Sequence, residues 1–324
     1  MKNIAIIMGG YSSEVQISLL SGNVVFNNLD KAKYNGYRIH ILKEGWFYCN
    51  ENEQLSAVDK NDFSIEVDGQ KVKFDAVFNA IHGTPGEDGL MQAYFALLEI
   101  PQSSCGYYQA ALTFNKRDLL SVLKPYGIKT ATSYYLNQGE EINADEIVKI
   151  VGLPCFVKPN KSGSSFGISK VKSQDELEDA IEKAYKEDDE IIIESFLDGT
   201  EVSVGVIKYN NKVTVLPISE IVSENDFFDY EAKYLGKSQE ITPARISDEM
   251  TLKIQKIAKR IYEILKMDGF SRSEFILVND EPHLLELNTV PGMTNESLLP
   301  QQAEKAGITL EQLFSNSIEM ALRK

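Results

Sequence analysis

The feature that most constrains the fold is a pair of apolar runs around a polar turn, close to the C-terminal end of the chain. The runs cover residues 270–278 and 283–287, and the turn between them, 279–282, contains Asn, Asp and Pro. Two apolar runs that flank such a turn predict a β-hairpin. This part of the chain is therefore expected to form antiparallel strands with one polar and one apolar face.

Alternation along these strands groups polar side chains. Arg272 and Glu274 are two residues apart and share one face, as do Glu286 and Asn288. Antiparallel pairing brings the two polar faces together. Carboxylate and amide oxygens suit Mg²⁺, which takes one or two carboxylates with phosphate oxygens and water. A solvated strand pair is the alternative, but the turn over 288–294 leaves the amide facing a cleft and favours a metal site.

Length and charge limit the classes of protein that fit. The 324 residues suffice for two or three lobes around a cleft. A net charge of −15 argues against a nucleic-acid or membrane partner, so a bound phosphate needs a few converging cations. Cys49, Cys105 and Cys155 are far apart and suggest neither disulfides nor zinc. Without a recognisable signal peptide or membrane-spanning run, we expect a cytoplasmic protein.

The first motif follows an apolar run over 4–8. It reads Gly-Gly-Tyr-Ser-Ser-Glu over 9–14 and leads into a predicted helix, with Ser13 and Gln16 at capping-box spacing. The dinucleotide fingerprint G-x-G-x-x-G is absent. A carboxylate here would repel a pyrophosphate, so we interpret Glu14 as facing a cation such as a substrate amine. Capping by a surface glutamate is the alternative.

A second glycine-rich loop follows the strand expected over 75–81. It begins at His82, reads His-Gly-Thr-Pro-Gly-Glu-Asp-Gly, and precedes a predicted helix over 90–98. Ligands of α/β sheets usually bind at the C-terminal ends of strands. His82 is therefore interpreted as lining a site, with a satisfied loop histidine as the alternative.

Two lysines stand where a phosphate can be held. A helix predicted over 109–124 carries Lys116, and a strand that ends in Lys158 runs into a Gly/Ser loop with Ser164 and Ser165. Backbone N–H groups, hydroxyls and a lysine can together hold phosphate oxygens, in a pattern that differs from the P-loop. A flexible surface loop is the alternative.

The next segments predict a nucleotide site and a lid. Residues 190–206 read as two strands around a turn, in which Glu194, the Leu197 backbone and Glu201 can hold an adenine amino group and a ribose diol. Single carboxylates of this kind more often face solvent. Residues 225–241 are polar and aromatic without clear periodicity, and we interpret them as a lid.

Taken together, five motifs resemble the D-alanine:D-alanine ligases of the ATP-grasp superfamily. They lie in the family's order over 9–14, 82–89, 158–165, 230–234 and 286–294. The resemblance implies an α/β, three-lobed ATP-grasp fold. Its lobes are an N-terminal Rossmann-like (pre-ATP-grasp) domain over 1–100, a central ATP-grasp lobe over 101–189, and a C-terminal lobe over 190–324 with the lid and the metal site.

The family also implies an activity. Two D-alanines would be joined to D-alanyl-D-alanine through a D-alanyl phosphate, for peptidoglycan, by a homodimer that uses ATP and two Mg²⁺ ions, which Mn²⁺ can replace. Tyr234 favours D-alanine over D-lactate as the second substrate. The first alternative is a carboxylate–amine ligase with D-Ser or D-lactate as second substrate. The second is a catalytically silent nucleotide-binding protein, which the complete metal set and Arg272 disfavour.

Individual roles follow from the same resemblance. The residues similar to the family's nucleotide contacts are Lys116, Lys158, Ser164, Ser165, Glu194, Phe196, Leu197, Glu201 and the lid residue Lys233. The expected metal ligands are Glu274, Glu286 and Asn288, where the first stands at a position that is more often Asp. The expected catalytic residues are Glu14, Ser164, Tyr234, Arg272 and Gly292. The expected substrate contacts are Glu14, His82, Arg272, Gly292, Ser297 and Leu298.

Overall fold

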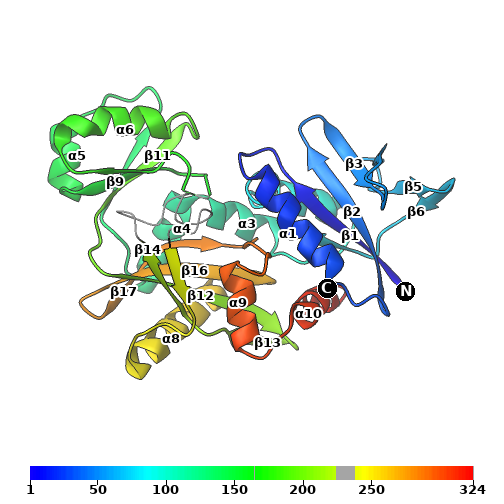
Figure 1. Ribbon diagram of the computed structural model, residues 1–324. Coiled ribbons are helices and arrows are strands. Elements are labelled where there is room, and N and C mark those ends of the chain that lie inside the picture. Colours follow the sequence, from blue (N-terminus) through cyan, green and yellow to red (C-terminus); the bar gives the residue numbers. More distant parts are fainter. Residues whose placement is uncertain (164, 224–237, 324) are drawn as a thin grey trace.

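The computed structural model describes residues 1–163, 165–223 and 238–323 (Figure 1). Its main sheets have five, four and six strands, and each forms the centre of one lobe. Helices pack on these sheets, so the architecture is α/β. Among the described residues, no helix is long and apolar enough to cross a membrane.

The first sheet has the strand order β4-β3-β2-β1-β7, and β1 pairs in parallel with both β2 and β7. Its elements are β1 (Lys2–Gly9), α1 (Val15–Asn27), β2 (Tyr34–Leu42), β3 (Gly45–Cys49), β4 (Leu55–Ala57), β7 (Ala76–Asn79) and α2 (Leu90–Leu97), with a separate hairpin of β5 (Ile65–Val67) and β6 (Gln70–Val72). Alternate residues of β1 enter different cores. Ile4 and Ile6 pack in one cluster, and Ala5 and Ile7 pack in another. A strand covered on both faces explains the continuous apolar run.

The predicted capping box at Ser13 and Gln16 is wrong. Helix α1 begins after Glu14, and no side chain caps its N-terminus. The preceding loop is instead held by neighbouring strands and loops, because the Gly10 N–H donates to a β2 carbonyl at 2.7 Å and the Tyr11 N–H donates to the Thr84 carbonyl at 2.8 Å. Tertiary hydrogen bonds thus replace the local cap.

The second sheet has the order β10-β9-β11-β8 and is antiparallel throughout. Its elements are β8 (Ser133–Asn137), α5 (Ala144–Val151), β9 (Cys155–Pro159), β10 (Ser169–Val171), the 3₁₀ turn η2 (Gln174–Glu176), α6 (Leu177–Ala184) and β11 (Glu190–Ser195). Helices α5 and α6 share one apolar core with these strands. This lobe lies apart from the first sheet in Figure 1.

The third sheet has the order β15-β14-β12-β16-β17, with β13 paired to β12. Its elements are β12 (Thr200–Tyr209), β13 (Lys212–Val215), β14 (Ser219–Ser223), β15 (Ser238–Ile241), α8 (Asp248–Ile264), β16 (Phe270–Val278), β17 (Glu281–Asn288), α9 (Leu298–Lys305) and α10 (Leu310–Ala321). Strands β11 and β12, predicted as a pair around a turn, belong to different sheets. The four residues between them therefore connect the second sheet to the third.

The predicted hairpin is confirmed as β16 and β17, with a shorter turn. Asn279 and Asp280 both have positive φ, 49° and 62°, which is the backbone of a two-residue hairpin turn. Glu281 and Pro282, expected in the turn, already pair with β16. The lid interpretation fails over 238–241, which forms β15, whereas 225–237 lies outside the described residues.

The single helix predicted over 109–124 is two helices, α3 (Tyr107–Phe114) and α4 (Lys116–Leu123), followed by the 3₁₀ turn η1 (Lys124–Tyr126). Asn115 breaks the helix because its backbone is extended, and its side chain accepts the Asp118 N–H to cap α4. Apolar residues of α4 pack with the third sheet. The domain boundaries at residues 100 and 189 stay predictions.

Candidate active site

A cavity of about 410 Å³ is lined by residues of the second and third sheets and of the segment that joins them. Most of the expected nucleotide and metal contacts lie on its wall: Lys116, Lys158, Ser165, Glu194, Phe196, Leu197, Glu201, Glu274 and Glu286. Ser164, Lys233 and Tyr234 lie outside the described residues. The volume is in the range of pockets that hold small molecules. The sequence-predicted contacts thus come together from segments far apart in the chain.

One end of the cavity contains a buried ion pair. The Nζ of Lys158 lies 2.7 Å from Oε2 of Glu194, and the Glu194 side chain is 3% exposed. Its second oxygen, Oε1, is buried and has no hydrogen-bond partner within the described part of the chain. Burial tends to lower the pKa of Lys158, but Glu194 and other carboxylates together raise it. A buried acceptor without a partner is costly, so this oxygen points to a ligand that donates a hydrogen bond.

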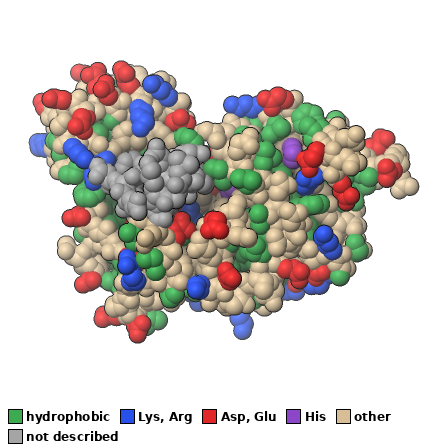
Figure 2. All heavy atoms as spheres, viewed as in Figure 1, with side chains coloured by type: hydrophobic (Ala, Val, Ile, Leu, Met, Phe, Trp, Pro, Cys, Tyr) green, Lys and Arg blue, Asp and Glu red, His purple; other side chains and the backbone are tan. Residues whose placement is uncertain are grey.

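A second cation lies at the start of α4. The Nζ of Lys116 donates to the Ser162 carbonyl at 2.8 Å and lies 3.1 Å from Oε2 of Glu286. Both expected phosphate lysines therefore hold carboxylates within the cavity. On the face shown in Figure 2, Lys and Arg are scattered among Asp and Glu. Lys116 and Lys158, in contrast, lie together on the wall of the cavity.

The hairpin places the expected metal ligands on one face. Glu274 is opposite Glu286 and Arg272 is opposite Asn288 in the strand register. Arg272 forms an ion pair with Glu274, whereas the Asn288 side-chain oxygen accepts the Val290 N–H at 2.9 Å. Burial tends to lower the pKa of Arg272, but the carboxylates of Glu274 and Glu286 raise it.

This donor set fits Mg²⁺ only with help from a ligand. The described residues contain no group of three or more His, Cys, Asp or Glu side chains that could hold a metal ion. Two carboxylates and an amide oxygen leave coordination positions to be filled, and Mg²⁺ in nucleotide enzymes takes phosphate oxygens and water there. The hairpin therefore suits a metal that arrives with phosphate.

Glu14 reaches the same region from the first lobe. Its side chain is buried, and a Cβ added to Gly163 would come 2.8 Å from both of its carboxylate oxygens. A Cβ on Gly83 would come 3.1 Å from Oε2. The loops that contain Gly83 and Gly163 therefore leave just enough space for the Glu14 carboxylate. Glu14 thus lies against the loop that follows Lys158, and its role as a substrate contact stays a prediction.

His82 is buried and fully hydrogen-bonded. Its Nδ1 lies 2.8 Å from the Val290 carbonyl, and its Nε2 lies 2.9 Å from the Ser21 hydroxyl, which itself accepts the Met293 N–H. A carbonyl only accepts, so Nδ1 carries the hydrogen and Nε2 accepts the hydroxyl hydrogen. Burial lowers the pKa of His82, although Glu14 opposes this shift. In this structure, His82 holds the loop after β17 against α1.

The remaining predicted substrate contacts lie where that loop enters α9. The Ser297 hydroxyl lies 2.8 Å from the Thr294 hydroxyl. A Cβ added to Gly292 would come 2.6 Å from the same Ser297 hydroxyl. Leu298 packs on Ile221 of the third sheet. The three residues thus lie close together beside the hairpin.

The sequence analysis did not single out Glu87, although it lies in the quoted loop over 82–89. Its carboxylate is buried and accepts the Gly83 N–H at 2.6 Å. Burial, and then the neighbouring Glu14, raise its pKa to about 8. Glu87 also lines a small cavity with Lys116 and Glu286. Its position between Gly86 and Gly89 was a feature of the sequence that could have identified Glu87 as a candidate site residue.

Comparison with known proteins identifies the family. A family model described as D-ala D-ala ligase N-terminus matches residues 3–105, and one described as D-ala D-ala ligase C-terminus matches residues 122–319. A D-alanine–D-alanine ligase of Flavobacterium johnsoniae is 74% identical over 99% of this chain and 100% of its own length. The same enzyme of Christiangramia forsetii is 61% identical over 100% and 99% of the two chains.

Solved structures give the same result for the fold. The VanG D-Ala:D-Ser ligase of Enterococcus faecalis superposes with a TM-score of 0.87 at 32% identity and covers 99% of both chains. The D-alanine–D-alanine ligase of Bacillus anthracis in complex with ATP has a TM-score of 0.80 at 30% identity, over 100% and 98% of the chains. The expected three-lobed ATP-grasp fold is confirmed, and the chain belongs to the D-alanine–D-alanine ligase family.

Proposed function

We propose that this protein joins two D-alanine molecules to D-alanyl-D-alanine at the expense of ATP, for peptidoglycan precursor synthesis. The observation that carries the proposal is the cavity between the second and third lobes. It combines Lys116 and Lys158 with the carboxylates of Glu274 and Glu286, while Glu14 from the first lobe lies against the adjoining loop. Such a site can hold a nucleotide and an amino acid side by side.

The reaction has two steps. A carboxylate oxygen of the first D-alanine attacks the γ-phosphorus of ATP, the bond to the β,γ-bridging oxygen breaks, and ADP leaves. The amine of the second D-alanine loses a proton and attacks the acyl carbon, and phosphate departs from the tetrahedral intermediate. Phosphoryl transfer needs little covalent help from a protein, so positioning and charge neutralisation provide most of the catalysis.

The nucleotide contacts divide along the cavity. The free Oε1 of Glu194 accepts the adenine amino group, with Phe196 and the Leu197 backbone beside it, and Glu201 binds the ribose. Lys116, Lys158, Ser164, Ser165 and Lys233 contact the phosphates. Glu274, Glu286 and Asn288 would hold two Mg²⁺ ions, or Mn²⁺ in their place, and these ions neutralise phosphate charge.

The substrate contacts lie toward the first lobe. Glu14 binds the ammonium group of the first D-alanine, with Ser164 and Tyr234 as its partners. Arg272 and the Gly292 N–H stabilise the tetrahedral oxyanion. His82 supports this region, and Ser297 and Leu298 contact the second D-alanine.

Further parts of the proposal concern the whole protein. We infer a homodimer in the cytoplasm, without nucleic-acid or membrane partners. The lobe boundaries at 100 and 189 and a lid over 225–237 belong to the same proposal. D-Ser or D-lactate as second substrate is not favoured, because the relatives that are 74% and 61% identical carry the D-alanine–D-alanine name.

The test is phosphate release from ATP and Mg²⁺ with D-Ala, L-Ala, D-Ser and D-lactate, each alone and paired with D-Ala. Products are identified by mass. We expect release to require D-Ala and D-alanyl-D-alanine to be the main product. Phosphate release with a different pair of substrates would support the ATP site but overturn the assignment of D-alanine as the substrate.

A further inference from the structure

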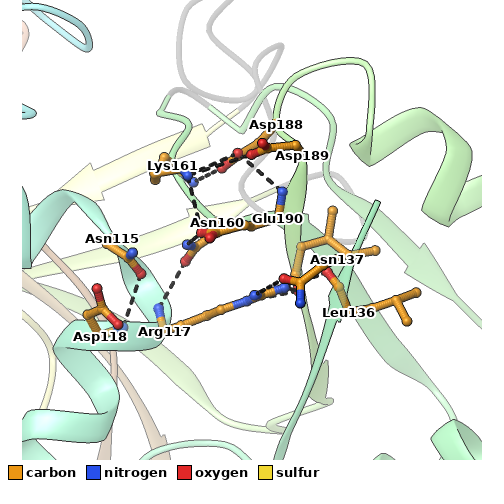
Figure 3. Close-up of polar contacts among 11 residues, drawn as sticks. Asn115, Arg117, Asp118, Leu136, Asn137, Asn160, Lys161, Asp188, Asp189 and Glu190 are labelled. Carbon is orange, nitrogen blue, oxygen red and sulfur yellow. Dashed lines mark hydrogen bonds and ion pairs between the residues drawn. The ribbon is translucent and has the colours of Figure 1, made fainter. Parts of the chain in front are cut away.

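Arg117, the neighbour of Lys116, connects α4 to the second lobe. Its guanidinium donates to the Ile191 carbonyl from Nε at 3.1 Å, to Oδ1 of Asn137 at 2.8 Å and to the Leu136 carbonyl at 2.5 Å (Figure 3). The ring of Tyr135 lies 5.1 Å below it. These partners belong to β8 and β11, so one side chain spans two strands of the second sheet.

The helix that carries Arg117 packs mainly against a different sheet. Leu119, Leu120 and Leu123 of α4 are fully buried in the core that includes Phe275 and Leu287 of the hairpin. The same hairpin carries the expected metal ligands. Arg117 therefore joins the second sheet, on one side of the nucleotide cavity, to a helix that packs on the third sheet, on the other side.

Asn160 makes a second connection, through the helix start. The first N–H groups of an α-helix have no partner inside the helix. Here the Lys116 N–H donates to the Asn160 carbonyl at 3.3 Å, and the Arg117 N–H donates to its side-chain oxygen at 3.0 Å. Asn160 follows Lys158 by two residues, so the chain segment that carries one expected phosphate lysine caps the helix that begins with the other.

Asn160 is itself held in place. It is fully buried, its N–H donates to the Glu190 carbonyl at 2.9 Å, and its Nδ2 donates to Oε2 of Glu190 at 2.7 Å. Lys161 lies 3.1 Å from the same carboxylate oxygen (Figure 3). Every polar group of the Asn160 backbone and amide thus has a partner, which leaves it little freedom to move.

We propose that Arg117 and Asn160 are positioning residues that fix Lys116 relative to Lys158, and so set the geometry in which the ATP phosphates are bound. The proposal rests on the ATP-dependent function above. A lysine side chain has large rotamer freedom, so the position of its backbone sets the region that its ammonium group can reach. The relative position of the two backbones therefore decides whether both ammonium groups can contact the same phosphates. A misplacement of about 1 Å in a reacting group can cost about a hundredfold in rate. Neither residue needs to touch ATP.

The chemistry of Arg117 suits this task. A guanidinium presents five donors in a rigid plane, whereas a lysine offers one rotating ammonium. The acceptors around Arg117 are two backbone carbonyls and one amide oxygen on adjacent strands. A lysine at this position can reach one or two of them but cannot hold both strands at a fixed angle to α4.

Arg38 offers a matched control. It is an arginine of similar burial, it donates to the Asn50 carbonyl at 2.6 Å, and it lies 5.3 Å from the Phe26 ring. It belongs to the first lobe, away from the nucleotide cavity. Arg38→Ala therefore removes comparable packing and hydrogen bonds without touching the connection between the second and third lobes.

The experiment compares Arg117→Ala, Arg117→Lys and Asn160→Ala with Arg38→Ala. ATP affinity is measured by calorimetry with Mg²⁺ and without D-Ala, and KM for ATP and for D-Ala by phosphate release. We expect each variant at Arg117 and Asn160 to weaken ATP binding about tenfold or more, with KM for D-Ala changed less than about threefold. Arg38→Ala should change neither.

Two outcomes would overturn the proposal. One is ATP affinity in Arg117→Lys, the variant least disturbing to folding, within twofold of the unmodified protein. The other is an equal loss in Arg38→Ala, which would indicate general destabilisation. Thermal melting of all variants identifies unfolded protein. Because the calorimetry contains no D-Ala, the result stands even if the panel of acids and amines points to another substrate.

Discussion

The Nζ of Lys116 lies 3.1 Å from Oε2 of Glu286, so an expected phosphate contact is paired with an expected metal ligand. Arg272 and Glu274 form a similar pair, and the Glu274 side of it lines the same cavity as Lys116 and Glu286. Two carboxylates of the site are thus each paired with a cation of the protein. Mg²⁺ can replace the cation of each pair and phosphate can replace the anion, so both ligands together satisfy groups that either ligand alone would leave unpaired.

Removal of the ammonium of Lys158 should destabilise the fold. The side chains of Lys158 and Glu194 are 14% and 3% exposed, and breaking a buried pair leaves an uncompensated charge. We expect Lys158→Ala to lower the free energy of unfolding by about 3 kcal/mol or more in urea titrations. Lys2→Ala breaks a pair with Asp75 of similar length but greater exposure, and should cost at most about 1 kcal/mol.

The double variant Lys158→Ala with Glu194→Gln separates charge from packing. Its second substitution removes the carboxylate that the first leaves unpaired. The double variant should therefore be more stable than Lys158→Ala alone. If both have the same free energy of unfolding, the unpaired charge is not the cause of the loss.

Arg272→Ala should reduce kcat for D-alanyl-D-alanine formation by about 10² to 10³, as removal of an oxyanion donor does. The measurement is steady-state phosphate release with ATP and D-Ala saturating. Arg272→Lys keeps a positive charge and should retain more activity. Near-normal turnover in Arg272→Ala would exclude this residue from transition-state stabilisation.

Gly163→Ala should weaken binding of the first D-alanine. A Cβ there would come 2.8 Å from both carboxylate oxygens of Glu14, so Glu14 must move away from its position. We expect KM for D-Ala to rise about tenfold or more, from the loss of a charge-assisted hydrogen bond. Gly106→Ala is the control, because its Cβ would meet mainly the flexible end of Gln109. Equal KM values in both variants would contradict the placement of Glu14.

Protonation of His82 should couple stability to pH. Burial lowers its folded pKa, whereas the unfolded chain binds the proton below about pH 6.5. Stability from neutral His82 is therefore present above about pH 6.5 and is lost as pH falls toward the folded pKa. Urea unfolding of His82→Gln between pH 7.5 and 5.5 should show a smaller decline than the unmodified protein. Identical declines would assign the effect to other groups, such as His40, whose pKa is also lowered by burial.

Alternation along the hairpin predicted that Glu274 and Glu286 lie on polar faces that meet, because side chains alternate along a strand. A register shift between Glu274 and Phe275, which alternation does not predict, sets Glu274 opposite Glu286. The capping box at Ser13 failed because the loop before it bonds to distant strands. The Arg117 and Asn160 connection could not be predicted, since several of the acceptors are backbone carbonyls, which every residue has, and the pairs are separated by 19 or more positions. Periodicity predicts faces, whereas such long-range hydrogen bonds appear only once the chain has folded.

Trp46 should report binding of the first substrate. It is the only tryptophan in the sequence, and its Nε1 donates to the Tyr11 hydroxyl at 2.9 Å. Tyr11 lies in the loop over 9–14 that presents Glu14. The indole is otherwise fixed by Tyr94 at 5.2 Å and by the Lys60 ammonium at 4.8 Å. A shift of the loop on substrate binding therefore alters one side of a rigid fluorophore.

We expect D-Ala to change the emission of Trp46 in a saturable way, with a midpoint close to its KM. ATP alone should have a smaller effect, because its proposed site is the cavity lined by the second and third sheets, whose described lining contains no residue of the loop over 9–14. Tyr11→Phe removes the hydroxyl that accepts the indole N–H of Trp46 but keeps the aromatic ring. In this variant, the emission of Trp46 should lose most of its response to D-Ala, while catalysis persists. An unresponsive emission in the unmodified protein at D-Ala concentrations that saturate turnover would show that the loop is already fixed before substrate binds, and that the glycines around Glu14 hold it without adjustment.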